Sequence, residues 1–256
     1  MVFSTFEKLA FIFGLLGNII SFLVFLAPLP TFYTIYKKKS SEGFQSIPYS
    51  VAFFSASLLL YYAFIKTNAY MIVSINGIGC VIEAIYLSIY VMYAPKKAKI
   101  FTMRMIFLFN VGGLGLIMAV SLLATKGARR VSFVGWVCAI INLAVFAAPL
   151  SIMNRVVRTK SVEFMPFTLS LFLTLCATVW FLYGFFVRDY YIALPNVLGF
   201  LFGIVQMILY LMYKNAENDG HGTNQNKDIE KNLNSNEAME RVEMINSKQD
   251  GTIKSV

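Results

Sequence analysis

The chain has 256 residues, of which 58% are apolar and 14% are charged, and its formal net charge is +9. Soluble domains are about 45–50% apolar and about 25% charged, so this composition predicts an integral membrane protein. The basic residues stand in short clusters between apolar stretches, and no groove-reading motif is present. Nucleic acid is therefore not expected as a partner.

Residues that usually build catalytic or metal sites are few and scattered. Cys80, Cys138 and Cys176 fall within apolar segments without metal-ligand spacing, and the single histidine, His221, lies in the polar C-terminal part. No catalytic triad, metal site or nucleotide-binding motif can be assembled from this sequence. We therefore expect neither an enzyme nor a bound metal or cofactor.

Seven segments are long and apolar enough to cross a bilayer, which requires about 20 residues of helix. The predicted transmembrane helices cover residues 10–36, 47–65, 71–93, 105–124, 131–153, 166–187 and 192–213. The first segment is too long for the apolar core of a signal peptide, so we expect it to be retained. Residues 214–256 are polar and charged, which predicts a disordered cytoplasmic tail because too little apolar area is present to offset the entropy of ordering.

The distribution of basic residues predicts the orientation, because Lys and Arg are enriched on the cytoplasmic side. With the N-terminus outside, the inner connections carry Lys37, Lys38, Lys39, Lys96, Lys97, Lys99, Arg155, Arg158, Lys160 and Lys214. The outer connections then carry the smaller set Lys8, Lys66, Lys126, Arg129, Arg130 and Arg188. The larger set favours an extracellular N-terminus and a cytoplasmic C-terminus. Lys126, Arg129 and Arg130 do not fit this orientation, because it places three basic residues in one outer connection.

An internal repeat is the most informative pattern in the chain. VFLAPL at residues 24–29 recurs as VFAAPL at residues 145–150, and Asn76-x-x-Gly79 recurs as Asn196-x-x-Gly199. Helices one to three therefore repeat as helices five to seven, and the fourth helix returns the chain to the starting side, so the two copies are parallel. Transporters are commonly built from such repeats with the substrate site between them, whereas a seven-helix receptor needs none.

The pattern predicts an all-α membrane protein whose seven transmembrane helices form two parallel three-helix repeats joined by an inverting fourth helix. Residues 1–100 form the first repeat in this division, residues 101–126 the linker helix, residues 127–213 the second repeat and residues 214–256 the tail.

Several motifs in a fixed order resemble one family. They are APLPTF, KKKSSEGFQSIPY, INGIGCVIE, APLSIM, VVRTKSVEFMPF, VWFLYG and ALPNVLG. This order resembles the SWEET sugar transporters of plants, also called the MtN3/saliva family, over about residues 6–213, and it is most similar to the sucrose-type members. The resemblance implies passive, bidirectional transport of a sugar by alternating access. It also implies the plasma membrane, with the vacuolar membrane second, and a homo-oligomer or a hetero-oligomer with related transporters.

Four prolines match the proline tetrad of the family: Pro28, Pro48, Pro149 and Pro166. A proline inside a helix removes a backbone hydrogen bond and kinks the helix. Their paired placement in the two repeats favours hinges, and four unrelated kinks are the alternative because membrane helices tolerate proline.

The candidate sugar site centres on Asn76, Asn196 and Trp180. An amide within a membrane helix requires partners, and its donors and acceptor suit sugar hydroxyls. A flat indole suits the C–H face of a pyranose ring, and Leu59 stands at the position that corresponds to Trp180 in the first repeat. A single asparagine could instead form hydrogen bonds between helices. The tryptophan could instead belong to the belt of aromatic residues at the membrane interface.

Further site residues are implied by the resemblance. The remaining candidates for the sugar pocket are Ser21, Val24, Ser55, Asn142, Val145 and Cys176. Small side chains at Val24 and Val145 favour sucrose, whereas the departures from sucrose-type members at Asn142, Cys176 and Leu59 leave a hexose open. Tyr62, Tyr183 and Asp189 resemble the extracellular gate of the family, and for the tyrosines an aromatic belt is the alternative.

Glu83 is the one acidic residue deep in a predicted helix, and no chain of titratable groups accompanies it. Ion-driven transport usually requires such groups, so the sequence favours a uniporter. A proton-coupled sugar carrier that uses Glu83 is the first alternative, and a seven-helix receptor that does not transport is the second.

Overall fold

In the computed structural model, the described part of the chain is residues 5–214 except 146, 163–164 and 166. Within it, helix is the regular structure, and seven helical spans are long and apolar enough to cross a membrane. This confirms the prediction of an all-α membrane protein with seven helices. The predicted tail lies outside the described residues, except for Lys214, and the three boundaries drawn between repeats, linker and tail stay predictions.

The first three spans form one group. The first span consists of α1 (Thr5–Leu26) and α2 (Leu29–Lys38), the second is α3 (Ile47–Ile65), and the third is α4 (Tyr70–Tyr93). α1 packs against α4, and α3 packs along α4.

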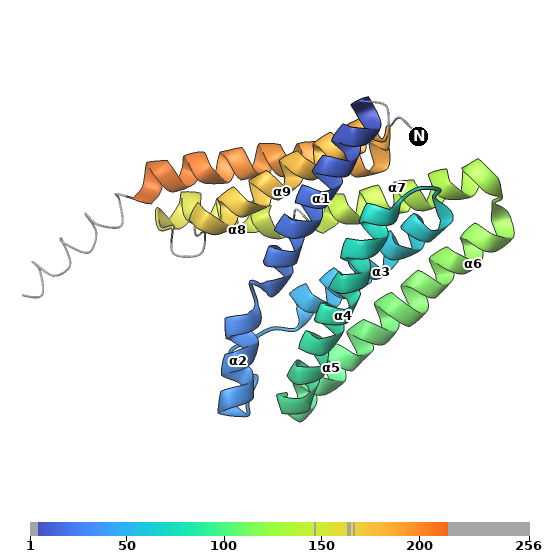
Figure 1. Ribbon diagram of the computed structural model, residues 1–256. Coiled ribbons are helices and arrows are strands. Elements are labelled where there is room, and N and C mark those ends of the chain that lie inside the picture. The colour runs from blue at the N-terminus through green and yellow to red at the C-terminus, as the bar shows by residue number, and fades with distance from the viewer. Residues whose placement is uncertain (1–4, 146, 163–164, 166, 215–256) are drawn as a thin grey trace, which may run out of the picture.

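The fourth span is the linker and consists of α5 (Lys96–Ile106), the π-helical turn η1 (Phe107–Gly113) and α6 (Leu114–Ala124). It begins nine residues before the predicted residue 105, because the helix continues past its apolar part into the lysine-rich turn that hydropathy excludes. It runs along the outer side of α3 (Figure 1).

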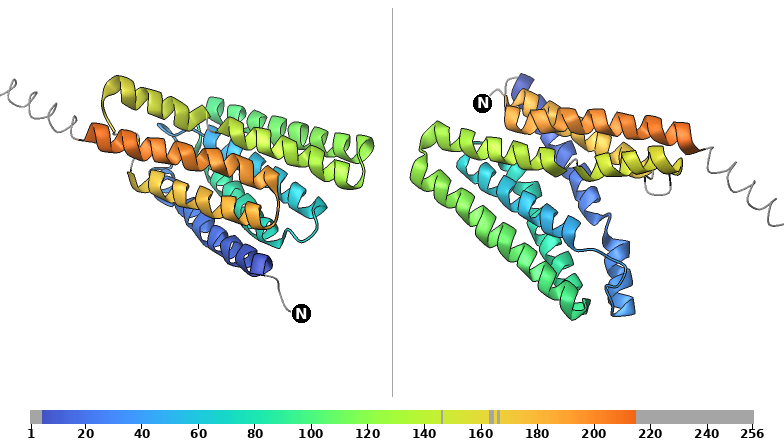
Figure 2. Two further views of the ribbon diagram at one scale, coloured as in Figure 1. Left: turned by 90° about the horizontal axis from the view of Figure 1, so that it is seen from above. Right: turned by 180° about the vertical axis from the view of Figure 1, so that it is seen from behind.

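The last three spans form the second group. They are α7 (Gly127–Val145) followed by α8 (Ala147–Thr159), then α9 (Phe167–Phe186), and finally the C-terminal span Tyr190–Lys214. The two groups contact each other through α1 with α9 and through α3 with α7. Figures 1 and 2 show that the groups meet at the end that carries the N-terminus and diverge toward the ends of α2 and α8.

The buried apolar residues divide in the same way. One cluster, which includes Leu58, Tyr62, Cys138 and Tyr183, draws on both groups and lies at the end where they meet. A second cluster contains Phe32, Ile35, Tyr86 and Tyr90, all from the first group, and a third contains Met153, Val156 and Met165 from the second group. The two diverging ends are therefore packed separately, each within its own group.

Backbone details repeat between the two groups. Lys39 and Lys160, which directly follow α2 and α8, both have a left-handed backbone, with φ of 54° and 56°. Each ammonium donates a hydrogen bond to a tyrosine hydroxyl at the end of the third helix of its group, Lys39 to Tyr93 at 3.1 Å and Lys160 to Tyr213 at 3.0 Å. The bond to Tyr93 raises the pKa of the Lys39 side chain above its usual value. The sequence repeat is thus also a repeat of local geometry.

Pro28 and Pro48 lie at helix beginnings. Pro28 follows the end of α1 and precedes α2, so the first span is interrupted there. Pro149 lies in α8, within the span Gly127–Thr159. Pro48 is the second residue of α3, where a missing N–H breaks no helical hydrogen bond. At Pro48 the structure therefore differs from the expected kink inside a helix. Pro166 lies outside the described residues.

Replacing Gly184 on α9 by alanine should lower the stability of the protein, because the glycine packs closely against the backbone of a neighbouring span. A Cβ at this position would lie 2.8 Å from the backbone nitrogen of Ala193, which cannot move without shifting the C-terminal span. We expect Gly184→Ala to lower the stability by about 1–3 kcal/mol, which corresponds to roughly 2–10 °C in the midpoint of heat-induced loss of the monodisperse fraction in detergent.

Gly77→Ala is the matched control, because a Cβ at Gly77 on α4 meets no atom within 4 Å. Alanine is the better helix former, so this variant should melt at the wild-type temperature or slightly above it. Equal loss of stability in both variants would contradict the packing argument.

Candidate functional site

A cavity of about 290 Å³ lies between the two groups of helices, and both groups contribute residues to its wall. Its lining residues are Ser21, Phe25, Leu59, Ile72, Ile75, Asn76, Asn142, Val145, Cys176, Trp180, Tyr191, Ile192, Pro195 and Asn196. Most of the wall is apolar, and the polar groups are concentrated in a serine, a thiol, an indole N–H and three amides. Such a wall suits a small neutral ligand with hydroxyl groups.

Asn76 and Asn196 lie in this cavity with the same local geometry. The side-chain N–H of Asn76 donates to the carbonyl of Ile72 at 2.9 Å, and that of Asn196 donates to the carbonyl of Ile192 at 2.7 Å. Each amide keeps a second N–H and a carbonyl oxygen that have no partner within the described ranges. Because unpartnered polar groups in a membrane are expensive, a ligand with hydroxyls is the natural complement.

The indole ring of Trp180 packs against α1 and is held there by a hydrogen bond and by an aromatic neighbour. Its indole N–H donates to the hydroxyl of Ser21 at 2.9 Å, and that hydroxyl also lies 3.3 Å from the sulfur of Cys176. Gly17 allows this approach, because a Cβ there would lie 2.9 Å from the indole ring. Tyr183 packs edge-on against the same indole, with the ring centroids 5.3 Å apart. The ring is therefore fixed in position before any ligand arrives.

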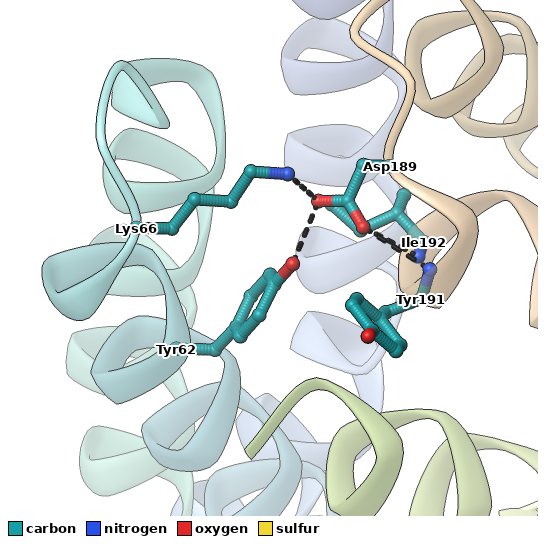
Figure 3. A network of polar contacts seen from close by, with 5 residues as sticks. All are labelled: Tyr62, Lys66, Asp189, Tyr191 and Ile192. Carbon is teal, nitrogen blue, oxygen red and sulfur yellow. Dashed lines mark hydrogen bonds and ion pairs between the residues drawn. The ribbon is translucent and has the colours of Figure 1, made fainter. Parts of the chain in front are cut away.

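Asp189 joins the two groups through a network of polar contacts at the end where they meet (Figure 3). One oxygen of its buried carboxylate accepts a hydrogen bond from the Tyr62 hydroxyl at 2.9 Å and forms an ion pair with Lys66. The other oxygen accepts the backbone N–H groups of Tyr191 and Ile192 at 3.1 and 3.3 Å. The carboxylate thus caps the C-terminal span and links it to the end of α3.

Two stretches of the chain, residues 11–98 and residues 132–218, match the profile of one family, which is described as sugar efflux transporter for intercellular exchange. The chain belongs to the MtN3/SWEET family. The double match corresponds to the two groups of three spans.

Curated SWEET relatives extend the comparison over most of the chain. The bidirectional sugar transporter NEC1 of Petunia hybrida is 66% identical over 211 residues, which are 82% of this chain and 79% of the relative. The bidirectional sugar transporter SWEET9 of Arabidopsis thaliana is 61% identical over 216 residues, which are 84% of this chain and 83% of the relative. These relatives are transporters, so the expectation that the chain is not an enzyme is confirmed.

A solved structure supports the same assignment. The chain is similar to a eukaryotic SWEET transporter whose structure was determined at 3.7 Å resolution, with a TM-score of 0.78 and 34% sequence identity. The similarity covers 83% of this chain and 100% of the solved one. The expected family and fold are therefore both confirmed.

Most of the residues that the SWEET resemblance implied for the sugar pocket lie around the cavity. Ser21, Leu59, Asn76, Asn142, Val145, Cys176, Trp180 and Asn196 line it. Ser55 does not line it but donates its hydroxyl to the Asn142 side-chain oxygen at 3.1 Å, so it lies behind that amide. Val24 on α1 is also absent from the lining.

Sequence reasoning missed several wall residues: Phe25, Ile72, Ile75, Tyr191, Ile192 and Pro195. Ile72 and Ile192 lie one helical turn before the two asparagines, so helical spacing from Asn76 and Asn196 could have found them. It also missed Lys66 at the closed end, although Lys66 lies one turn after Tyr62. Tyr183, expected at the gate, lies in the shared apolar cluster and contacts Trp180.

Glu83 is buried in α4 but does not line the cavity. One of its carboxylate oxygens is buried without a hydrogen-bond partner among the described residues. A sugar in the cavity would not contact this carboxyl group.

The reactivity of Cys138 tests whether the Asp189 contacts hold the two groups together. The Cys138 thiol is 1% exposed within the shared apolar cluster. Asp189→Asn removes the charge that joins Tyr62 and Lys66 across the two groups. Breaking a buried pair costs about 3–5 kcal/mol, and even about 1.4 kcal/mol shifts an opening equilibrium tenfold. We expect Cys138 to react with a small thiol reagent at least about tenfold faster in a Cys80→Ser, Cys176→Ser background.

Arg188→Gln is the matched control, because Arg188 is the exposed neighbour of Asp189 and forms no ion pair in the described part of the chain. Its labelling rate should equal that of the background protein. An unchanged rate in Asp189→Asn would show that the carboxylate does not hold this end closed.

Proposed function

We propose that this SWEET protein carries sucrose down its concentration gradient, in either direction, by alternating access of the central cavity. Facilitative sugar transport is supported by relatives that are named bidirectional sugar transporters. The choice of sucrose over a hexose, the role of each residue and the membrane that the protein occupies are our proposals.

The paired asparagines carry the argument for sugar binding. Asn76 and Asn196 place equivalent amides from the two repeats in one cavity, each with an unused donor and acceptor. Trp180 provides a fixed aromatic surface in the same cavity for the C–H face of a sugar ring. Amides and an indole can bind a sugar without a charge, and weak neutral binding allows the sugar to leave.

Sucrose is favoured by a small side chain in the wall. Val145 lines the cavity, and its small side chain leaves more room for a second sugar ring than a larger one would. Asn142, Cys176 and Leu59 depart from the sucrose-type pattern and leave a hexose open. Flux measurements with both sugars decide between these substrates.

Alternating access is supported by the way the apolar clusters are distributed. The shared cluster and the Asp189 contacts close one end, while the diverging ends are packed separately. The halves can thus move against each other with the break at Pro28 as one hinge, and we propose Pro149, the corresponding residue of the second repeat, as the other. With the N-terminus outside, as the basic residues favour, the closed end is extracellular and this conformation faces the cytoplasm.

We propose the plasma membrane as the location, with the vacuolar membrane second. Assembly with further copies, or with related transporters, is an expectation from the family resemblance that the single chain does not test.

The first measurement is uptake of labelled sucrose and labelled glucose into liposomes that contain the purified full chain. Asn76→Ala and Asn196→Ala should each lower sucrose flux by at least about tenfold, because each removes hydrogen bonds worth about 1.5 kcal/mol or more to the bound sugar. Trp180→Ala should lower it similarly. Glucose flux without sucrose flux would keep the cavity and overturn the substrate.

Two native residues provide matched controls for these variants. Asn110 lies in η1, outside the cavity lining, and Phe107, in the same turn, is 67% exposed. Asn110→Ala and Phe107→Ala should transport at the wild-type rate. Equal losses in the controls would place the effect on folding, and the absence of flux in folded wild-type protein would favour the receptor alternative.

Glu83→Gln distinguishes the uniporter from the proton-coupled carrier. Because Glu83 lies outside the cavity, we expect sucrose uptake by both wild type and Glu83→Gln to be the same with and without an imposed proton gradient. Accumulation driven by the gradient in wild type, and its loss in Glu83→Gln, would establish proton coupling instead. Equilibrium exchange of labelled sucrose, measured without a gradient, checks that the variant is folded.

A further inference from the structure

The linker span plays no part in the central cavity, yet one face of α5 combines charge with apolar surface. Lys96, Lys97 and Lys99 begin the helix, and all three are exposed without an ion-pair or hydrogen-bond partner in the described part of the chain. Lys96 and Lys99 lie on the same helix face as Met103 and Ile106, because residues three and four apart share a face. Cations therefore stand at the end of an apolar stripe.

A second hollow, of about 240 Å³, lies where this stripe faces α4. It is lined by Phe53, Ala84, Leu87, Ser88, Val91, Met103 and Ile106, and it shares no residue with the central cavity. The hydroxyl of Ser88 donates to the carbonyl of Ala84 at 2.7 Å, so its donor is already used. The wall therefore offers an apolar ligand a complementary surface and gives a polar ligand little to bind.

Further cations lie at the same end of the molecule. Lys37 and Lys38 end α2 and are exposed, and Figure 1 shows that the end of α2 and the start of α5 lie at the same extremity of the first repeat. The connection between α2 and α3 adds one acidic residue, Glu42. The extremity is thus strongly basic.

We propose that this face binds an anionic phospholipid, with one acyl chain in the hollow between α4 and α5 and the phosphate at Lys96 and Lys99. Ile106 follows Lys99 by seven positions, which corresponds to about 10 Å along a helix. This distance from the lysine to the apolar end of the stripe fits within the depth of one bilayer leaflet. Clusters of lysine beside a membrane span attract anionic headgroups. The ligand thus matches both the charge and the apolar groove.

The acidic residues in positions 215–256 are the competing occupant for the lysines. That segment is polar, so it complements the cations but not the apolar hollow. A lipid complements both, and for that reason we favour it. Orientation in the membrane explains basic residues at this end, but it does not require a groove on the same helix face.

Native mass spectrometry of the full chain in detergent tests the proposal with two probes that share their acyl chains. Dioleoylphosphatidylglycerol should bind about tenfold more tightly than dioleoylphosphatidylcholine. The variant Lys96→Gln, Lys97→Gln, Lys99→Gln should lower the affinity for phosphatidylglycerol to that for phosphatidylcholine. Ser88→Leu, which fills the hollow, should weaken both lipids.

Two controls separate this site from general charge effects. Lys126→Gln with Arg129→Gln removes exposed cations at the start of the fifth span and should leave lipid binding unchanged. Replacing Lys96, Lys97 and Lys99 by arginine keeps the charge and should keep the preference for phosphatidylglycerol. Retained binding in the triple glutamine variant would overturn the proposal. Carbodiimide cross-links from these lysines to residues 215–256, persisting with phosphatidylglycerol present, would also overturn it.

Discussion

The carboxylate of Asp189 joins the two halves of this transporter at one end, and the rest of the arrangement depends on that contact. A buried negative charge is tolerated when it is fully paired, and here Tyr62 and Lys66 come from one half while two backbone N–H groups come from the other. The contact joins the end of α3 to the start of the C-terminal span. At the opposite ends the halves diverge, and each packs its own apolar cluster.

Packing explains why the divergent ends stay folded. Each half buries its own aromatic and aliphatic cluster at that end, around Phe32 and Tyr86 in one half and around Val156 in the other. A movement that brings the ends together therefore need not repack either cluster. The break in the first span, at Pro28, lies between the shared cluster and the cluster around Phe32, so bending there can be confined to a short segment.

The repeat and the seven helices could be predicted because hydropathy and self-similarity depend on composition and order alone. Asn76 and Asn196 could be placed together because they occupy corresponding positions of the two repeats, and Trp180 was added to them by the family resemblance. Val24 and Ser55 did not reach the cavity wall, since helix rotation of a few tens of degrees decides which neighbour faces inward. Pro48 was expected to kink a helix, but its effect depends on where the helix begins, and hydropathy does not locate the first turn.

The contacts at Lys66 show a different limit of sequence reasoning. Its partner, Asp189, lies more than a hundred residues away, and the two positions do not correspond in the repeat, so self-similarity could not pair them. The pairing is asymmetric because the position in the first repeat that corresponds to Asp189 is Ala69. A charge contact between repeats can be read from one sequence only when both copies retain it.

The hydrogen bonds from Asn76 and Asn196 to their own helices bear on the half of the transport cycle that carries no sugar. A passive carrier must reorient empty after each delivery, and an empty membrane site with bare amides would resist closure. Here one donor of each amide is already bound to the carbonyl of Ile72 or Ile192, so less polar surface has to be stripped of water when the vacant site closes. In the proposed mechanism, the two internal bonds would reduce the barrier for the return of the empty carrier, and net sugar flow would then be as fast as the exchange of bound sugar for sugar.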